Sequence, residues 1–232
     1  MLHSLMLHSN IFPQIMCLCI LIMPKNHAVM LKVLQVPLPN ATIVHDIRGA
    51  VDLMVATNEE DIFLALIMWH GHKTTKGWQN ENGDLIPFST LTERILSLTN
   101  KRVHALFYSC FNAKHPELVN CFRRCIAFET TVSRVNPAHI LPLILDHVQR
   151  EHLSATSFMA LSDKVTNLTK ESMSIWAGGD KLITICCFEN GDILKRNQIR
   201  EVKDEDTGCK EYTVCTDLYD DNAHAHFSTP IS

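Results

Sequence analysis

Two short polar motifs each follow a strongly apolar run of strand length, and both contain side chains suited to acyl-transfer chemistry. The run at 61–69, DIFLALIMW, leads into His70-Gly71-His72, and the run at 102–109, RVHALFYS, leads into Cys110. A thiolate attacks carbonyl carbons well, and an imidazole with a pKa near neutrality takes the thiol proton and returns it to a leaving amine. The motifs therefore predict a cysteine–histidine nucleophilic pair, if the fold brings them together.

The glycine between the two histidines fits the same chemistry. Because Gly71 has no side chain, a substrate carbonyl can approach its N–H closely. We expect the amides of Gly71 and Cys110 to form an oxyanion hole. His70 is the preferred base, and His72 stays open as an alternative because Gly71 leaves the local chain direction undetermined. Asn112 is expected to cap the turn after Cys110, or else to orient the imidazole.

The elements that must position these residues alternate between strands and helices. Continuous apolar runs predict strands, and helical spacing or capping residues predict helices. The polar segment 77–88, around Asn82-Gly83, predicts a hairpin or another excursion from the sheet. The predicted strands are 15–23, 28–36, 61–69, 102–109, 125–132 and 181–189, and the predicted helices are 42–57, 89–99, 115–125, 136–152 and 156–165.

This alternation predicts an α/β protein with a mostly parallel central sheet and helices on both faces. Consecutive parallel strands usually pair, about 5 Å apart, and ligands bind at their carboxyl ends. We therefore expect strands 61–69 and 102–109 to be neighbours that deliver His70 and Cys110 to one edge of the sheet.

Length and composition predict a globular protein. The chain has 232 residues, 46% of them hydrophobic and 20% charged, which favours one domain at 1–199 followed by an acidic, polar tail or peripheral segment at 200–232. The net charge is −4 and the Lys and Arg residues are scattered, so no nucleic-acid partner is expected. The sequence assigns no oligomeric state.

Cysteine usage and the N-terminal region bear on the compartment. Nine cysteines at irregular spacings resemble neither a disulfide framework nor a paired zinc motif, and this favours a cytoplasmic protein. The apolar stretch 11–24 is too short to span a membrane, so no membrane partner is expected. It has no preceding Lys or Arg, which favours a first strand over a targeting segment, although the second interpretation stays open.

Taken together, the motifs resemble the caspase-like (clan CD) cysteine peptidases, and among them the CHAT domain family. The resemblance spans about residues 15 to 190 and rests on the strand ending in His-Gly, the excursion ENGDLIPFSTL, the strand ending in YSCFNA, and the following segment TTVSRVNPAHILPLILDHVQREHLSATSFMALSDKV. It implies a caspase-like three-layer sandwich, with the family's His-Gly pair on His70-Gly71 and its nucleophile on Cys110. It further implies a cysteine endopeptidase that cleaves protein or peptide substrates through a thioester, without cofactor or metal.

The chain departs from that family in two places. Few residues separate the predicted strands 15–23 and 28–36, where a caspase fold has a helix, so the N-terminal unit is expected to be abbreviated. Phe111 is bulky where caspases have a small residue after the nucleophile.

Two other functions remain open from the sequence. One is a catalytically inactive caspase-like module that binds other proteins. The other is a metal-dependent hydrolase that uses the His-Gly-His strand end. The metal site would need further ligands at later strand ends, and Glu129 is the only acidic residue within 125–132. His224 and His226 are interpreted as incidental to function.

Overall fold

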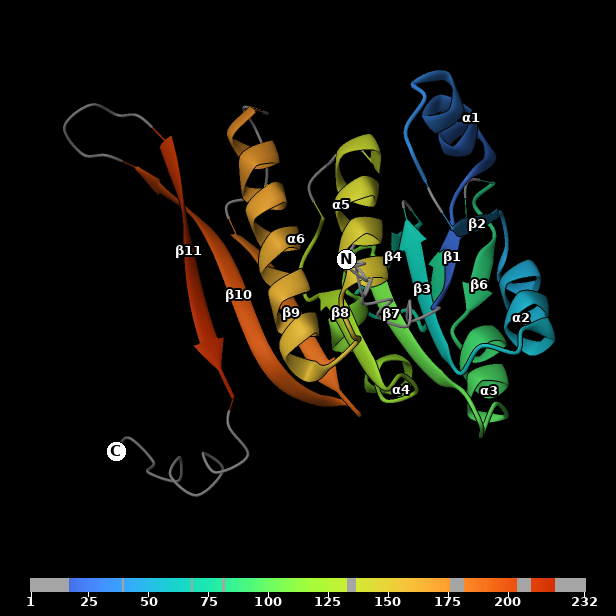
Figure 1. The fold of residues 1–232 in the computed structure, drawn as a ribbon. Coiled ribbons are helices and arrows are strands. Elements are labelled where there is room, and N and C mark those ends of the chain that lie inside the picture. The colour runs from blue at the N-terminus through green and yellow to red at the C-terminus, as the bar shows by residue number, and fades with distance from the viewer. Residues whose placement is uncertain are drawn as a thin grey trace, which may run out of the picture.

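A computed structural model describes residues 17–38, 40–67, 69–80, 82–132, 137–175, 182–203 and 210–219. Its main feature is an eight-stranded sheet with the strand order β11-β10-β9-β8-β7-β3-β1-β2 (Figure 1). The strands are β1 (Leu18–Ile22), β2 (Ala41–Val44), β3 (Asp61–Ile67), β7 (Arg102–Tyr108), β8 (Arg124–Phe128), β9 (Leu182–Glu189), β10 (Asp192–Lys203) and β11 (Lys210–Leu218).

The sheet has a larger parallel part and a smaller antiparallel part. The pairs β1–β2, β1–β3, β3–β7 and β7–β8 are parallel. The pairs β8–β9, β9–β10 and β10–β11 are antiparallel. The prediction of an α/β protein with a mostly parallel central sheet is confirmed.

Helices cover both faces of this sheet and form two hydrophobic cores. The first core joins α1 (Lys25–Val33), α5 (Pro137–Arg150) and α6 (Ala155–Ile175) to one face. The second core joins α2 (Ile47–Ala56), α3 (Ser89–Leu96) and α4 (Pro116–Val119) to the other. The three-layer arrangement expected from the sequence, a central sheet with helices on both faces, is therefore observed.

Strands β3 and β7 lie side by side at the centre of the sheet. They pair from Asp61 with Arg102 to Ile67 with Tyr108. The last six residues of each strand are buried, because helices cover both faces, and this explains why both read as continuous apolar runs. The prediction that these strands are neighbours is confirmed.

A second, three-stranded antiparallel sheet follows β3. It consists of β4 (His70–Gly71), β5 (Gly77–Gln79) and β6 (Leu85–Pro87). The turn between β5 and β6 contains Gly83 at a φ of 85°, a backbone conformation that favours glycine. The predicted hairpin within 77–88 is confirmed, and α3 begins directly after it.

The prediction of a strand at 28–36 is wrong, because this segment is largely helix α1. The apolar run AVMLKVLQV has no alternation that separates a strand from a partly buried helix, so periodicity alone does not decide. In the helix, Leu31 is buried whereas Val29 and Val33 are exposed. The order β1-α1-β2-α2-β3 therefore corrects the expectation of an abbreviated N-terminal unit: a helix does connect the first two strands.

Several other boundaries also differ from the prediction. The helix expected at 115–125 is observed only as α4 (Pro116–Val119), and β8 already begins at Arg124. The segment 42–57 contains strand β2 before helix α2, whose first turn is capped by the Asp46 carboxylate accepting from the Gly49 N–H at 2.7 Å. At the C-terminal end, the main sheet crosses the predicted boundary at 199, because β10 continues to Lys203 and β11 is its edge strand. The polar composition there fits a strand with few buried side chains. Residues 220–232, with His224 and His226, lie outside the described residues, and so do residues 11–16 of the apolar N-terminal stretch.

Within the described ranges, no helix is long and apolar enough to cross a membrane.

Candidate active site

The two predicted motifs meet at the carboxyl edge of β3 and β7. Strand β4 begins at His70, three residues after β3 ends, and Cys110 lies two residues after β7 ends. A Cβ atom built on Gly71 would lie only 1.8 Å from the carbonyl oxygen of Cys110. The backbone of the His-Gly motif therefore packs directly against the backbone of the cysteine, and only glycine fits at position 71.

The Cys110 sulfur faces the segment that follows β8. The Val132 N–H donates to Cys110 Sγ at 3.2 Å, and the Phe111 N–H donates to the Thr130 carbonyl at 3.0 Å. An N–H donor directed at the sulfur favours its negatively charged form. Cys110 as a residue is half-buried.

Phe111 gives the chain a sharp turn after the cysteine. Its φ is 59° and its ψ is 8°, a left-handed conformation that costs a non-glycine residue on the order of 1 kcal/mol. The Phe111 side chain is half-buried, so the turn accommodates the bulky residue noted in the sequence. This turn places Cys110 at the tip of the β7 strand end.

Asn112 holds that turn from inside the protein. Its side chain is fully buried, and its Nδ2 donates to the carbonyls of Ser109 at 2.8 Å and Cys110 at 3.2 Å. Its Oδ1 accepts a hydrogen bond from Trp78 Nε1 at 2.7 Å. Trp78 lies in β5 directly opposite Gly71. Asn112 thus ties together the backbone on the amino side of the turn, rather than capping the turn that follows as the sequence suggested, and it also links the cysteine turn to the small sheet that carries Gly71.

The two histidines of the first motif differ in their surroundings. His70 is exposed, and in the β4–β5 ladder it lies opposite Gln79. His72 is half-buried, and its carbonyl accepts a hydrogen bond from His115 Nε2 at 2.9 Å. The His115 ring is buried and packs edge-on against Phe88, with ring centroids 4.9 Å apart. His115 therefore holds the chain just after Gly71.

Two buried hydroxyl groups lie next to the cysteine in the sequence. Ser109 Oγ and the Tyr108 hydroxyl make no hydrogen bond of normal geometry within the part of the chain that the structure describes. Burial raises the pKa of Tyr108 well above its ordinary value, so its hydroxyl stays protonated at neutral pH. Both groups are uncharged at neutral pH.

Sequence reasoning did not identify Trp78, His115 or Val132 as site residues. Each acts on the motifs through a hydrogen bond between segments far apart in the sequence, such as the 43 residues between His115 and His72. No local sequence pattern predicts such contacts, because they form only when the hairpin and the strand ends fold together.

Glu129, the acidic residue that a metal site would have to use, is paired with an arginine instead. Glu129, which directly follows β8, forms an ion pair with Arg196 of β10. Among the residues that the structure describes, no group of three or more His, Cys, Asp or Glu side chains is placed to hold a metal ion.

Comparisons with known proteins give little further information. No protein-family model matches the sequence, and no curated protein matches it. Among solved structures, the complex of the pro- and mature domains of RgpB from Porphyromonas gingivalis has a TM-score of 0.33 at 13% identity, covering 86% of this chain and 67% of that chain. A similarity of this size does not define a family for the chain. Its class is set by its own architecture: an α/β sandwich with a mostly parallel central sheet.

Proposed function

We propose that the protein is a cysteine endopeptidase of the caspase-like type, with Cys110 as nucleophile and His70 as general base and acid. The observation that carries the proposal is the packing of Gly71 against the Cys110 carbonyl, 1.8 Å from where a Cβ would lie. This contact holds a histidine-bearing strand and a cysteine-bearing turn together at the carboxyl edge of the sheet. Such a pair of residue types, at such an edge, is what nucleophilic acyl transfer requires.

The reaction would proceed in two halves. The His70 imidazole takes the thiol proton, and the Cys110 thiolate attacks the carbonyl carbon of the scissile peptide bond. The amides of Gly71 and Cys110 donate to the resulting oxyanion. The imidazolium protonates the departing amine, which leaves a thioester. His70 then deprotonates a water molecule, which attacks the thioester and releases the acid and the thiol.

The surroundings of the sulfur support this role. The Val132 N–H donor favours a thiolate, and Asn112 fixes the turn that carries it. The His70 side chain is exposed, so its ring is accessible to a substrate. His72 is the alternative base, but its carbonyl is held by His115 and its side chain is half-buried.

Three substitutions test the assignment. Cleavage of a fluorogenic peptide library should fall at least about 1,000-fold in Cys110→Ala and His70→Ala and less than about fivefold in His72→Ala. Circular dichroism and thermal unfolding should show that all three variants fold. If His72→Ala is silent and His70→Ala abolishes cleavage, His70 is the base; the reverse result assigns the role to His72. Cleavage that survives Cys110→Ala but stops with a chelator would contradict the proposal and favour the metal-dependent alternative.

Thiol labelling gives a second test that needs no substrate. Iodoacetamide should label Cys110 faster than Cys215, which is exposed on β11 and serves as the matched control. Cys186 and Cys187 should react slowly, because burial raises the pKa of each thiol to about 12. Equal rates at Cys110 and Cys215, together with no cleavage of any library peptide, would favour an inactive interaction module.

We also propose a cytoplasmic location and membership of the CHAT group within the caspase-like peptidases. The location is supported by the cysteines, since no disulfide joins any two of those that the structure describes. The sequon Asn167-Leu168-Thr169 also supports a cytoplasmic location, because it lies within helix α6 and Thr169 is fully buried, which does not favour glycosylation. Mass spectrometry that finds a glycan at Asn167 in the native cell would overturn the proposed location.

A further inference from the structure

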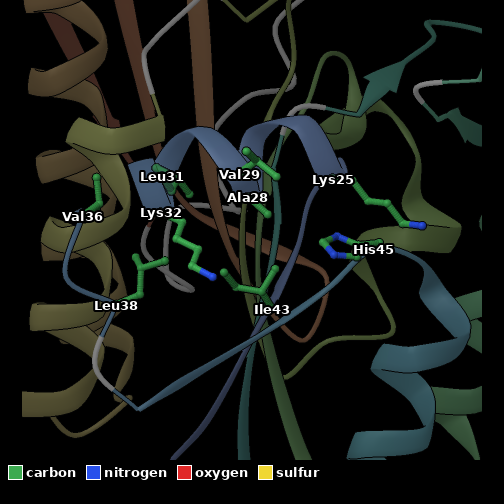
Figure 2. A pocket seen from close by; sticks show the side chains of 9 residues that line it. All are labelled: Lys25, Ala28, Val29, Leu31, Lys32, Val36, Leu38, Ile43 and His45. Carbon is green, nitrogen blue, oxygen red and sulfur yellow. The ribbon is translucent and has the colours of Figure 1, made fainter. Parts of the chain in front are cut away.

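A pocket lies far from the Cys110 turn in the sheet order, at the β2 edge of the sheet. It has a volume of about 540 Å³ and lies between helix α1 and strand β2 (Figure 2). Its walls are largely apolar, with Leu31 from the helix, Ile43 from the strand and Leu38 from the connection between them. A hollow of this size and composition is typical of binding sites rather than of packing defects.

Two ammonium groups flank this apolar surface. Lys25 and Lys32 both line the pocket, and Figure 2 shows the Lys32 side chain running down from α1 toward Ile43. No ion pair of either lysine occurs within the described residues, and no Asp or Glu lines the pocket. The pocket is therefore complementary to a ligand that is apolar in the middle and negatively charged on both sides.

Strand β2 adds hydrogen-bonding groups to the same place. It is the last strand of the sheet, and no described strand pairs with its outer edge. The Met23 N–H donates to the Val44 carbonyl, so the backbone groups of Val44 face β1. Because backbone groups alternate between the two sides of a strand, the N–H and C=O of Ile43 face outward. Among the described residues no hydrogen bond to these outward groups of Ile43 occurs, so the residue whose side chain lines the pocket also offers a backbone donor and acceptor.

We propose that this edge binds an extended acidic peptide segment, which adds as a strand beside β2 and places an apolar side chain in the α1–β2 pocket. Addition to a free edge uses main-chain hydrogen bonds for affinity and alternate side chains for specificity. Lys25 and Lys32 are seven residues apart, about 10 Å along the helix. Acidic residues two positions before and after an apolar one lie on the same face of a strand, about 13 Å apart. Flexible lysine side chains span the difference, so the preferred pattern is acidic-x-apolar-x-acidic.

Fluorescence anisotropy with a labelled peptide tests the proposal. The probe is fluorescein-Thr-Glu-Thr-Leu-Thr-Glu-Thr, and the protein is the full chain with Cys110→Ala, so that no cleavage complicates binding. We expect the probe to bind and Thr-Lys-Thr-Leu-Thr-Lys-Thr to bind at least tenfold more weakly. Equal binding of the two peptides, or no binding of the acidic one at 1 mM protein, would overturn the proposal.

Charge reversal on the protein locates the site. The double substitution Lys25→Glu with Lys32→Glu should weaken binding of the acidic probe at least tenfold. The matched control is Arg48→Glu with Lys203→Glu, which makes the same charge change at two exposed positions outside the pocket and should weaken it less than threefold. Similar losses in both double variants would mean that net charge alone attracts the probe. Thermal unfolding of each variant shows that the fold is kept.

N-methylation separates strand addition from simple pocket filling. One probe carries N-methyl groups on the Glu and Leu residues, and a second carries them on the inner Thr residues. In a strand beside β2, the backbone N–H groups of only one of these two sets of residues face the β2 edge. The affinity of one probe should therefore fall at least tenfold, and that of the other less than threefold. Equal affinity of both probes would exclude pairing with β2. A dimer in sedimentation that Lys25→Glu with Lys32→Glu dissociates would instead identify a second copy of the chain as the occupant. Neither result depends on whether Cys110 is catalytic.

Discussion

The paired strands β3 and β7 have a histidine at each end, and the two ends treat the imidazole differently. At the amino end, His104 Nε2 lies 3.3 Å from the Asp61 carboxylate, and the ring is 1% exposed and packs against Phe158. At the carboxyl end, His70 is exposed beside the turn that carries Cys110.

The difference shows why a histidine–carboxylate contact does not by itself make a base. Burial lowers the pKa of His104 to about 4, and the raising effect of Asp61 only partly offsets it. The His104 ring is therefore neutral at pH 7 and gives up no proton on demand. A general base must change its charge near the working pH, which requires contact with solvent or a stronger partner. Substitutions at the amino end should therefore change stability, whereas substitutions at the carboxyl end should change peptide cleavage.

Among substitutions that leave Cys110 and His70 in place, the largest effect is expected at the carboxyl end, from Gly71→Ala. The new Cβ would collide with the Cys110 carbonyl, so the two backbones must move apart and the proposed oxyanion donor is displaced. We expect kcat/KM for peptide cleavage to fall about 100- to 1,000-fold. Steady-state kinetics on the best library peptide measures the loss.

A second glycine provides the control for that experiment. A Cβ on Gly49, within helix α2, would meet its nearest atoms at 3.5 and 3.6 Å, which is ordinary contact. Gly49→Ala should leave cleavage unchanged and stabilise the fold by about 0.5–1 kcal/mol, because alanine loses less backbone entropy in a helix. If Gly71→Ala keeps full activity, the proposed oxyanion hole is wrong.

The next effect belongs to the amino end and appears as a pH dependence of stability. The pKa of His104 is about 4 in the fold and ordinarily 6.5, so the unfolded chain binds this proton first as the pH falls. The contribution of neutral His104 is complete above about pH 6.5 and is lost progressively down to about pH 4. The loss in the free energy of unfolding is on the order of 3 kcal/mol. Urea denaturation between pH 7.5 and 4 measures it.

His104→Gln tests whether this group is responsible. The variant keeps a donor near Asp61 but cannot be protonated, so the slope of unfolding free energy against pH should fall by up to about one proton. The pKa of His147 is also lowered by burial, and it accounts for part of the slope that remains. A slope identical to that of the unsubstituted protein would show that His104 does not titrate in this window.

A smaller effect is expected from Asn112, which holds the cysteine turn. Asn112→Ala removes three hydrogen bonds from a fully buried position and should lower the free energy of unfolding by about 2 kcal/mol. A looser turn should lower kcat roughly tenfold and leave KM nearly unchanged, since the side chain acts through the placement of Cys110. Trp78→Phe removes the indole donor and also part of a fully buried ring, so it should cost on the order of 2 kcal/mol. A change confined to KM would contradict a positioning role for Asn112.

The same strand pair shows what the sequence could predict. Strands β3 and β7 were predictable because both faces are covered, so nearly every residue is apolar. Their adjacency and shared edge followed from the chain order. Helix α1 was not predictable, because its nine residues mix apolar and polar positions without a clear period.

Within the site, the motif residues were predictable and their supports were not. Gly71 and Cys110 stand at strand ends and could be located from the apolar runs before them. The bond from Trp78 to Asn112 spans 34 residues, and the bond from Val132 to Cys110 spans 22. Such contacts depend on how a hairpin and a loop pack against the strand ends in the tertiary structure. The sequence therefore identifies reactive side chains better than it identifies the side chains that hold them.

The smallest effect should come from Arg102, the charged residue at the amino end of β7. Its guanidinium donates to the Asp61 carboxylate at 2.7 and 2.8 Å, but its side chain is 53% exposed, so water and salt screen the pair. Arg102→Gln should lower the free energy of unfolding by less than about 1 kcal/mol at pH 7, and 1 M NaCl should remove most of that difference. Removing this cation should also raise the pKa of His104 slightly, because Arg102 opposes a second positive charge nearby. The loss of stability on acidification should then still begin near pH 6.5, but it should end at a slightly higher pH and be slightly smaller than in the unsubstituted protein. Urea denaturation across pH in low and high salt measures both effects, and a change in peptidase rate would contradict the division between the two ends of the strand pair.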